Sequence, residues 1–303
     1  MTKGLTNCLV TGGAGFIGSH LTKRLLEEGC RVTVIDDLSE GKWENLPKHP
    51  KLIKHEGSIL DDMSRLVKGK DVIFHLAALP RLQRSIAEPW QTHNVNVDGT
   101  LNLLLQAKEH KIKRFVFSSS SSVYGDQNQL PFTEDMKPNP LVPYSLQKVI
   151  GEEYCKLFSN LWGLGTISLR YFNVYGPRMY PDGAYANLIP KFIKLMSHDQ
   201  IPTINGDGNQ TRDFTYVEDV VEANLLAARS RIKGEVFNIG RGENISVNKV
   251  VAILNRLMEK NIRPIHGPAV VEPRASLAGT RRARDLLGWV PKIKFEEGLK
   301  TMI

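Results

Sequence analysis

Tyr144 and Lys148 stand four residues apart in a segment that opens with Pro143. Proline favours the first turn of a helix, and residues at this spacing share one helix face, so we expect a helix over 143–161 that presents both side chains together. A lysine cation beside a phenol favours the ionised phenol, so the pair predicts a tyrosine whose pKa falls below its usual value of about 10. Such a tyrosine can take a proton from a hydroxyl near neutral pH. The competing interpretation is an ordinary surface pair, because this spacing alone is common.

Hydroxyl groups follow a short apolar segment upstream of this pair. The serines of 118–122 come after Phe115-Val116-Phe117 and before Val123-Tyr124-Gly125. If the apolar residues form a strand of a parallel sheet, Ser118, Ser120 and Ser122 stand at its carboxyl end, where open α/β sheets bind their ligands. The alternative interpretation is a polar surface loop.

Three glycines near the N-terminus have the spacing of a phosphate-binding turn. Gly12, Gly15 and Gly18 lie between the apolar segment 7–11 and the segment 16–28, whose apolar residues recur with helical spacing. Glycine permits a tight turn and close approach of the backbone to a pyrophosphate. The helix that follows presents unpaired N–H groups and a partial positive charge. The pattern predicts a dinucleotide site.

An acidic residue lies where a dinucleotide site requires one, at the end of the second expected strand. Asp36 closes the β-branched segment 31–36. A carboxylate there can accept both ribose hydroxyls of NAD and would repel the 2′-phosphate of NADP, and no arginine follows in Leu38-Ser39-Glu40. NAD is therefore the expected cofactor. The competing interpretation is a plain tight turn with a surface acid.

Short apolar segments alternate with helical ones through the first half of the chain. Such alternation predicts an α/β fold, with a doubly wound parallel sheet of the Rossmann type and helices on both faces. The segments expected to form its strands are 7–11, 31–36, 52–55, 72–76 and 115–118.

The amino-acid composition changes near residue 170, where Pro, Gly and Asn become frequent. We therefore expect an NAD-binding domain over 1–170 and a smaller, mainly substrate-binding lobe over 171–303. Segments near 213–240 are expected to return to the first domain, with strands at 214–217 and 236–239 joining its sheet.

Charge and cysteine usage exclude several classes of protein. The 40 Lys and Arg outnumber the 32 Asp and Glu, but they are dispersed, unlike the basic clusters of nucleic-acid-binding proteins. A basic surface instead suits ligands that carry pyrophosphates. No apolar run approaches the roughly 18 residues of a membrane span, and the N-terminal segment does not resemble a signal peptide. Cys8, Cys30 and Cys155 lack metal-ligand spacing and predict reduced thiols in the cytoplasm, with no metal site.

Taken in order, the motifs resemble the extended short-chain dehydrogenase/reductase family, and most closely its UDP-sugar 4-epimerase branch. The resemblance spans nearly the whole chain. It rests on Thr11-Gly12-Gly13-Ala14-Gly15-Phe16-Ile17-Gly18, His75-Leu76-Ala77-Ala78, Asn96-Val97-Asp98-Gly99-Thr100, the serine run, Tyr144 with Lys148, Arg170-Tyr171-Phe172-Asn173-Val174-Tyr175-Gly176-Pro177, Thr211-Arg212-Asp213-Phe214 and Leu286-Leu287-Gly288-Trp289.

The resemblance implies roles for the matching residues. Ser120 would hydrogen-bond the sugar 4-oxygen, Tyr144 would be the base, and Lys148 would be its partner and hold the nicotinamide ribose. Ser122 and Asn173 would contact the substrate, and Arg212 would grip its pyrophosphate with a bidentate guanidinium. The residues expected at the NAD site are Gly12, Gly15, Phe16, Ile17, Gly18, Asp36, Ser58, Ile59, Leu76, Ala77, Ala78, Arg81, Asn96, Ser118, Tyr144, Lys148 and Tyr171.

The serine run separates branches of the family. Dehydratases carry an Asp-Glu pair, and decarboxylases a Glu, where this chain has Ser121 and Ser122. We therefore expect inversion at C4 of a UDP-hexose, either UDP-glucose and UDP-galactose or their N-acetyl forms, through a transient 4-keto sugar, with NAD regenerated in each cycle. The alternatives are a UDP-glucuronate 4-epimerase, a nucleotide-sugar reductase or dehydrogenase with exchangeable cofactor, and a non-catalytic NAD- or nucleotide-sugar-binding protein. Family members are commonly dimers, so a homodimer is expected.

The chain departs from the family pattern at several positions. Ser58 replaces an Asp that lies near adenine, and Gln147 replaces a Ser. Ala269 stands where the family has a phosphate-binding Arg, seven residues before Ser276, and Arg274 is the expected substitute. Ser276 is small enough to leave room for a 2-acetamido group, although it is equally consistent with an ordinary loop serine.

Overall fold

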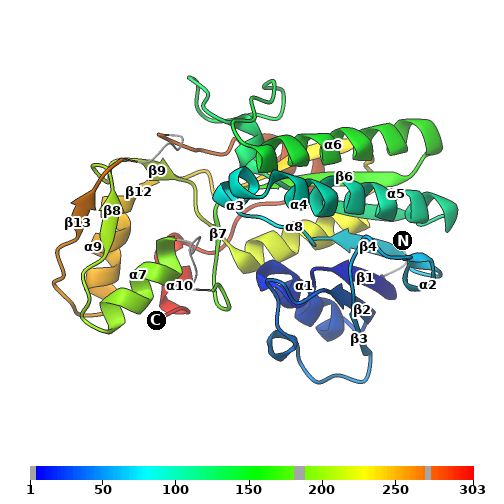
Figure 1. The fold of residues 1–303 in the computed structure, drawn as a ribbon, viewed down its shortest axis with the longest axis horizontal. Helices are drawn as coiled ribbons and strands as arrows, with labels where there is room; N and C mark the ends of the chain where they lie inside the picture. Colours follow the sequence, from blue (N-terminus) through cyan, green and yellow to red (C-terminus); the bar gives the residue numbers. More distant parts are fainter. Residues whose placement is uncertain (1–4, 181–187, 270–273) are drawn as a thin grey trace.

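The computed structural model describes residues 5–180, 188–269 and 274–303. A parallel sheet with helices on both faces makes up the larger part, and a smaller lobe lies beside the carboxyl ends of its central strands (Figure 1). Among these residues, no helix is both long and apolar enough to cross a membrane.

The main sheet contains seven strands, all parallel, in the order β11-β6-β5-β4-β1-β2-β3. The strand order reverses between β1 and β4, and sheets of this kind bind ligands in the crevice at that switch point. The doubly wound α/β fold expected from the sequence is confirmed. The strands are β1 (Asn7–Thr11), β2 (Arg31–Asp36), β3 (Leu52–Glu56), β4 (Val72–His75), β5 (Arg114–Ser120), β6 (Gly165–Tyr171) and β11 (Glu235–Ile239).

Alternate residues of the strands supply two apolar cores, one on each face of the sheet. Cys8 and Val10 pack with α1 and α8, whereas Leu9 packs with α5 and α6. The helix predicted over 143–161 is confirmed as α6. The helices around the sheet are α1 (Phe16–Glu27), α2 (Ser64–Val67), α3 (Leu82–Ala87), α4 (Pro89–His93), α5 (Gly99–Glu109), α6 (Pro143–Trp162) and α8 (Val217–Arg229), with single turns of other helix types at Trp43–Asn45, Asn94–Asp98, Ser121–Tyr124 and Ala283–Leu287.

The lobe encloses a core of its own, in which aromatic rings meet. The ring centroid of Phe295 lies 5.1 Å from that of Tyr175 and 5.1 Å from that of Phe214. The lobe consists of β7 (Val174–Tyr175), α7 (Leu188–Ser197), β8 (Thr203–Asn205), β9 (Thr211–Arg212), β10 (Thr215–Tyr216), β12 (Ile245–Ser246), α9 (Val247–Leu257), β13 (Ile265–Gly267) and α10 (Phe295–Lys300).

One of the two segments expected to return to the main sheet does not join it. The segment 236–239 joins the main sheet as expected, in β11 beside β6. The segment 214–217 does not, because β10 pairs with β7 in a separate two-stranded sheet. Burial of Phe214 and Tyr216 in the lobe core holds this segment away from the main sheet. The division of the chain at residue 170 stays a prediction.

Gly18→Ala is expected to weaken both the fold and dinucleotide binding. A carbon added at Gly18 would overlap the carbonyl oxygen of Gly12 and lie 2.8 Å from Cα of Gly13, so the glycine turn would have to shift. Overpacking of this kind costs about 1–3 kcal/mol. Thermal unfolding and the amount of NAD that copurifies measure the two effects. Gly15→Ala is the matched control, because its added carbon meets its nearest neighbour at 3.3 Å; equal losses in both variants would contradict the steric explanation.

Candidate active site

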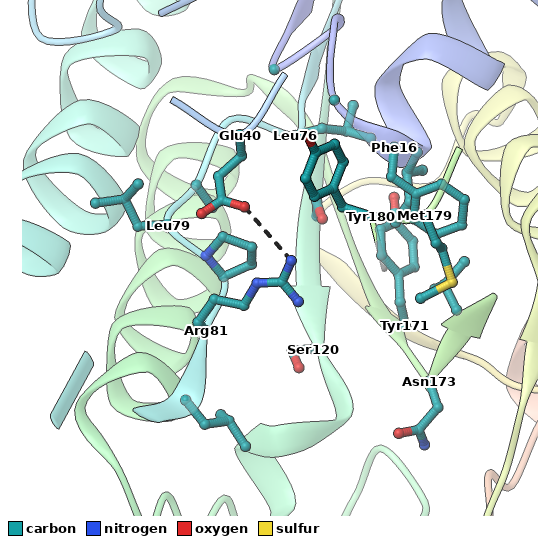
Figure 2. Close-up of a pocket in the computed structure, with 18 of the residues that line it drawn as sticks. Phe16, Glu40, Leu76, Leu79, Arg81, Ser120, Tyr171, Asn173, Met179 and Tyr180 are labelled. Carbon is teal, nitrogen blue, oxygen red and sulfur yellow. Dashed lines mark ion pairs between the residues drawn. The ribbon is translucent and has the colours of Figure 1, made fainter. Parts of the chain in front are cut away.

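A cavity of about 1070 Å³ opens between the carboxyl ends of the strands and the lobe. Its volume exceeds the usual range for small-molecule sites, roughly 300–1,000 Å³, and suits two ligands. Figure 2 shows side chains from both parts of the molecule pointing into it. The sequence-predicted residues in its lining are Gly12, Gly15, Phe16, Ile17, Gly18, Asp36, Ser58, Ile59, Leu76, Ala77, Ala78, Arg81, Ser118, Ser120, Ser122, Tyr144, Lys148, Tyr171, Asn173, Arg212 and Ser276.

The glycine turn forms one end of the cavity and has the shape of a dinucleotide cradle. Gly12 has φ +67°, and a carbon added to it would lie 2.6 Å from the backbone nitrogen of Ala77. Gly15 caps α1 without any side-chain hydrogen bond to the first turn, so the helix N–H groups there are available to an anion. The position of Gly12 accepts only a glycine backbone, and that backbone can approach a pyrophosphate closely.

Asp36 lies at the end of β2 and completes this half of the site. Its carboxylate accepts hydrogen bonds from the backbone N–H groups of Ala14 and Leu38, each at 2.9 Å, which fix its position in the lining. Burial raises the pKa of the carboxyl, while the backbone donors oppose that rise. Each oxygen keeps acceptor capacity for a ribose hydroxyl. The residues present therefore fit the NAD expected from the sequence.

The pair expected to be catalytic, Tyr144 and Lys148, lines the cavity from the first turns of α6. The Lys148 ammonium donates to the carbonyl oxygen of Ser118 at 2.7 Å and lies 5.6 Å from the ring centroid of Tyr144. Their side chains are almost fully buried, Lys148 at 3% exposed and Tyr144 at 8%. The Ser120 hydroxyl, at the end of β5, lies close enough to the phenol to favour its ionised form. The structure thus brings together the three residues expected to be catalytic.

The expected fall in the tyrosine pKa is wrong for the protein by itself. Burial raises the pKa of Tyr144 to about 12, and the nearby Ser120 side chain and the charge of Arg81 offset this only in part. Burial also lowers the pKa of the Lys148 ammonium, to about 8. Withdrawal from water disfavours the phenolate of Tyr144 and the ammonium of Lys148 alike.

The serine run supplies a second hydroxyl aimed at the same space. Ser120 Oγ accepts a hydrogen bond from the backbone N–H of Ser122 at 3.2 Å. Ser122 Oγ is buried and has no hydrogen-bond partner among the residues that the structure describes. An unsatisfied buried hydroxyl is costly, which is consistent with a partner that arrives with the substrate.

The lobe side of the cavity is built around Asn173, directly after β6. Its backbone has φ +25°, a strained value for a residue other than glycine. Its amide nitrogen donates to the carbonyl oxygen of Asp213 at 3.1 Å and to Ser276 Oγ at 3.3 Å. Arg212, on β9 next to Asp213, also lines the cavity. The predicted substrate contacts Asn173, Arg212 and Ser276 therefore form one wall.

Two predicted residues lie outside the lining. Asn96 is buried behind it, where its side chain exchanges hydrogen bonds with the backbone of Leu79 and donates to Gln147 Oε1 at 2.7 Å. Its amide is fully used by the protein, so it supports the loop after β4 and does not face the cofactor. Arg274 is exposed, and its charge adds to the hydrogen bonds from Asn209 that lower the pKa of the Asp207 carboxyl. Its role as substitute for the arginine expected at Ala269 stays a prediction.

Several lining residues escaped the sequence analysis. Lys42 donates to the hydroxyl of Tyr180 at 2.6 Å, and Glu40 forms an ion pair with Arg81 at 3.6 Å, so loops distant in sequence meet over the cavity (Figure 2). Arg178, with φ +69°, is held by Ser19 Oγ at 3.0 Å. These residues lie in loops without periodicity, so no sequence pattern indicates that they meet.

Comparison with known proteins gives consistent matches over the whole chain. A sequence profile of the NAD dependent epimerase/dehydratase family matches residues 8–240. A putative UDP-glucose 4-epimerase of Methanocaldococcus jannaschii is 41% identical over 300 residues, which cover 97% of this chain and 96% of that protein.

Solved structures agree with this match. A UDP-N-acetylglucosamine 4-epimerase of Methanobrevibacter ruminantium, solved with UDP-N-acetylmuramic acid, superposes with a TM-score of 0.96 at 38% identity, covering 99% of this chain and 97% of the other. A UDP-glucose 4-epimerase of Thermotoga maritima, solved with UDP-glucose, gives a TM-score of 0.94 at 39% identity, covering 98% and 97%.

Asp213→Asn is expected to loosen the lobe wall. The fully buried carboxylate accepts from the N–H groups of Arg241 (2.6 Å), Gly242 (2.8 Å) and Ala278 (3.0 Å), and an amide would turn a donor toward one of them. The lost bond should cost about 1–3 kcal/mol. Burial raises the pKa of Asp213 to about 6, so its protonated form stabilises the wild type at low pH and this contribution is lost as pH rises through 6.

Urea unfolding at pH 5 and pH 7 tests this expectation. The free energy of unfolding of Asp213→Asn should fall further below that of the wild type at pH 5 than at pH 7. The reason is that its amide cannot bind the proton that stabilises the wild type at low pH. The same substitution at exposed Asp199 serves as control. A deficit that does not change with pH would show that Asp213 titrates normally.

Proposed function

This chain belongs to the NAD dependent epimerase/dehydratase family, and on that premise we propose that it is an NAD-dependent nucleotide-sugar 4-epimerase. Its substrate is a UDP-hexose, either UDP-glucose and UDP-galactose or their N-acetyl forms, and the reaction passes through a transient 4-keto sugar. The observation that carries the proposal is the position of Ser120, Tyr144 and Lys148 in one cavity with the glycine turn and Asp36.

Proton transfer is the task of the residues at the end of β5 and the start of α6. Tyr144 takes the proton of the sugar 4-hydroxyl, either directly or through Ser120, which lines the same cavity. The Lys148 ammonium, held by the carbonyl of Ser118, stabilises negative charge that develops on the phenol. When bound, NAD supplies the acceptor and donor of hydride for C4, and the positive charge of its nicotinamide favours the ionised phenol.

Inversion requires the sugar to present both faces while the nucleotide stays in place. The side chains expected around the sugar are short hydroxyls, those of Ser120, Ser122 and Ser276, which give it room to turn. Arg212 lines the other part of the cavity with a permanent positive charge that suits the diphosphate. With Arg212 at the diphosphate and only serines at the sugar, the protein binds the nucleotide firmly and the sugar weakly.

Tyr144→Phe is expected to lower C4 inversion by about 10²–10⁴-fold, because it removes the proton acceptor and leaves the cavity unchanged in shape. Purified protein is incubated with UDP-glucose, UDP-N-acetylglucosamine and UDP-glucuronate, and the products are followed by NMR. Tyr154→Phe, on the same helix at a partly buried position that packs against the core, is the matched control. Full activity in Tyr144→Phe would overturn the assignment.

The same incubation separates an epimerase from a dehydrogenase or reductase. An epimerase returns its cofactor to the starting state, so product should accumulate without a stoichiometric change in the absorbance of reduced nicotinamide. Net formation or consumption of NADH in proportion to product would favour the exchangeable-cofactor alternative. Inversion of UDP-glucuronate alone would move the substrate class to the uronates, and no turnover with any sugar would favour a binding protein.

The enzyme forms a homodimer through α5 and α6. These helices lie side by side on one edge of the molecule (Figure 1). Leu105 on α5 and Leu146, Leu157 and Leu161 on α6 expose between 45% and 61% of their surface. The leucines of α6 recur on one helix face, and an exposed apolar stripe of this kind suits a second copy related by a twofold axis.

Leu157→Glu is expected to convert the dimer to a monomer, because it would place two carboxylates in the apolar contact. Size-exclusion chromatography with light scattering measures the mass. Leu286→Glu, at a leucine 55% exposed elsewhere on the surface, is the control. A Leu157→Glu protein with unchanged mass would rule out this interface.

The enzyme works in the cytoplasm. Its cysteines, Cys8, Cys30 and Cys155, are buried free thiols, as is usual in a reducing compartment.

A further inference from the structure

A buried ion pair lies directly behind the catalytic helix face. Glu152 follows Lys148 by one turn of α6. Its carboxylate receives two hydrogen bonds from the Arg170 guanidinium of β6, at 2.9 and 2.7 Å. Both side chains are nearly inaccessible, at 4% and 5% exposed. Burying two charges costs several kcal/mol per ion before their attraction is counted, so a pair in this position calls for an explanation.

One end of the pair reaches the strand that carries the catalytic serine. The Ser119 hydroxyl donates to Glu152 Oε1. Its neighbours along β5 are Ser118, whose carbonyl accepts from Lys148, and Ser120, whose side chain lies close enough to Tyr144 to favour the ionised phenol. Glu152 therefore fixes the strand between the two points where it contacts the catalytic pair.

The other end reaches the wall of the cavity. Arg170 Nη1 donates to the hydroxyl of Tyr124 at 2.8 Å, and that hydroxyl donates to Asn238 Oδ1 at 2.7 Å. The amide nitrogen of Asn238 donates to the carbonyl oxygen of Phe132 at 2.8 Å, and Phe132 lines the cavity. A single hydrogen-bonded chain thus runs from the catalytic helix to the wall.

The charges around Lys148 give this chain an electrostatic effect. Tyr144, Glu152 and Cys155 face Lys148 from its own helix, and His75 faces it from β4. Burial keeps the tyrosine and cysteine protonated and lowers the pKa of His75 to about 3, so these three groups are neutral. Glu152 is the charged neighbour, and its negative charge raises the pKa of Lys148 against the effect of burial.

We propose that Glu152 and Arg170 are positioning residues that together set the charge of Lys148 and hold Ser120 in place. Glu152 keeps the buried ammonium protonated, and Arg170 limits that effect by pairing with the same carboxylate. The proposal rests on the epimerase function, because it assigns these residues to the proton transfer of that reaction.

Neutralising each partner should move the titration of Lys148 in opposite directions. Glu152→Gln leaves Arg170 as an unpaired cation, so Lys148 should lose its proton at a pH lower by about one unit. Arg170→Gln leaves Glu152 with Lys148 as its nearby cation, so the carboxylate stabilises the ammonium more strongly. Lys148 should then lose its proton at a pH higher by a similar amount. Damage to the fold alone would not produce shifts of opposite sign.

Protein labelled with ¹³C at the lysine ε-carbons allows this titration to be followed by NMR, with the Lys148 signal assigned by its absence in Lys148→Met. The alkaline limb of the pH profile of kcat is measured in parallel and should shift with the NMR midpoint. Glu153→Gln, exposed on the same helix, is the matched control and should shift neither. Glu152→Asp keeps the charge and should restore most of the wild-type midpoint even where it lowers stability.

The proposal is overturned if the two Gln variants shift the midpoint in the same direction or not at all, or if Glu152→Asp and Glu152→Gln behave alike. Failure of the proposed function looks different: the wild type would then invert no UDP-sugar, while the NMR titration would still report on Lys148.

Discussion

Burial of a lysine ammonium beside a phenol is the constraint on which the rest of this site depends. An ammonium taken from water loses its hydration, and the protein must replace it with acceptors and negative charge. The carbonyl of Ser118 supplies the first and Glu152 the second. Because one comes from β5 and the other from α6, the helix and the strand must keep a fixed register for Lys148 to remain charged.

The sheet topology turns this local arrangement into a site for two ligands. Parallel strands end at the same edge, so the glycine turn after β1, Asp36 at the end of β2 and the serines at the end of β5 open onto one crevice. The lobe closes that crevice with Asn173, Arg212 and Ser276. Asp213 joins the loops of this wall through three backbone N–H groups, and the strained backbone of Asn173 is kept in place by its bonds to the same wall.

Burial also explains why the phenol stays protonated in the protein by itself. Low dielectric penalises the phenolate as well as the ammonium, and Ser120 and the charge of Arg81 do not cancel that penalty. A positive charge brought by a bound ligand would favour the phenolate. The low dielectric of the buried site strengthens that interaction, so the phenol becomes a proton acceptor when the ligand is bound. Ser121 and Ser122 line the same cavity and place hydroxyls there instead of carboxyl groups.

The sequence by itself determined the features that depend on local spacing. Periodicity placed α6 over Tyr144 and Lys148, glycine spacing placed the dinucleotide turn, and strand–helix alternation indicated the doubly wound sheet, because each of these follows from backbone geometry within about twenty residues. Tertiary structure decided the rest. Asn96 turned inward because Leu79 and Gln147 take its amide, and the segment 214–217 stayed in the lobe because its aromatic rings are buried there. The pairing of Glu152 with Arg170 and the pKa of Tyr144 depend on burial and on partners far along the chain, which no local pattern records.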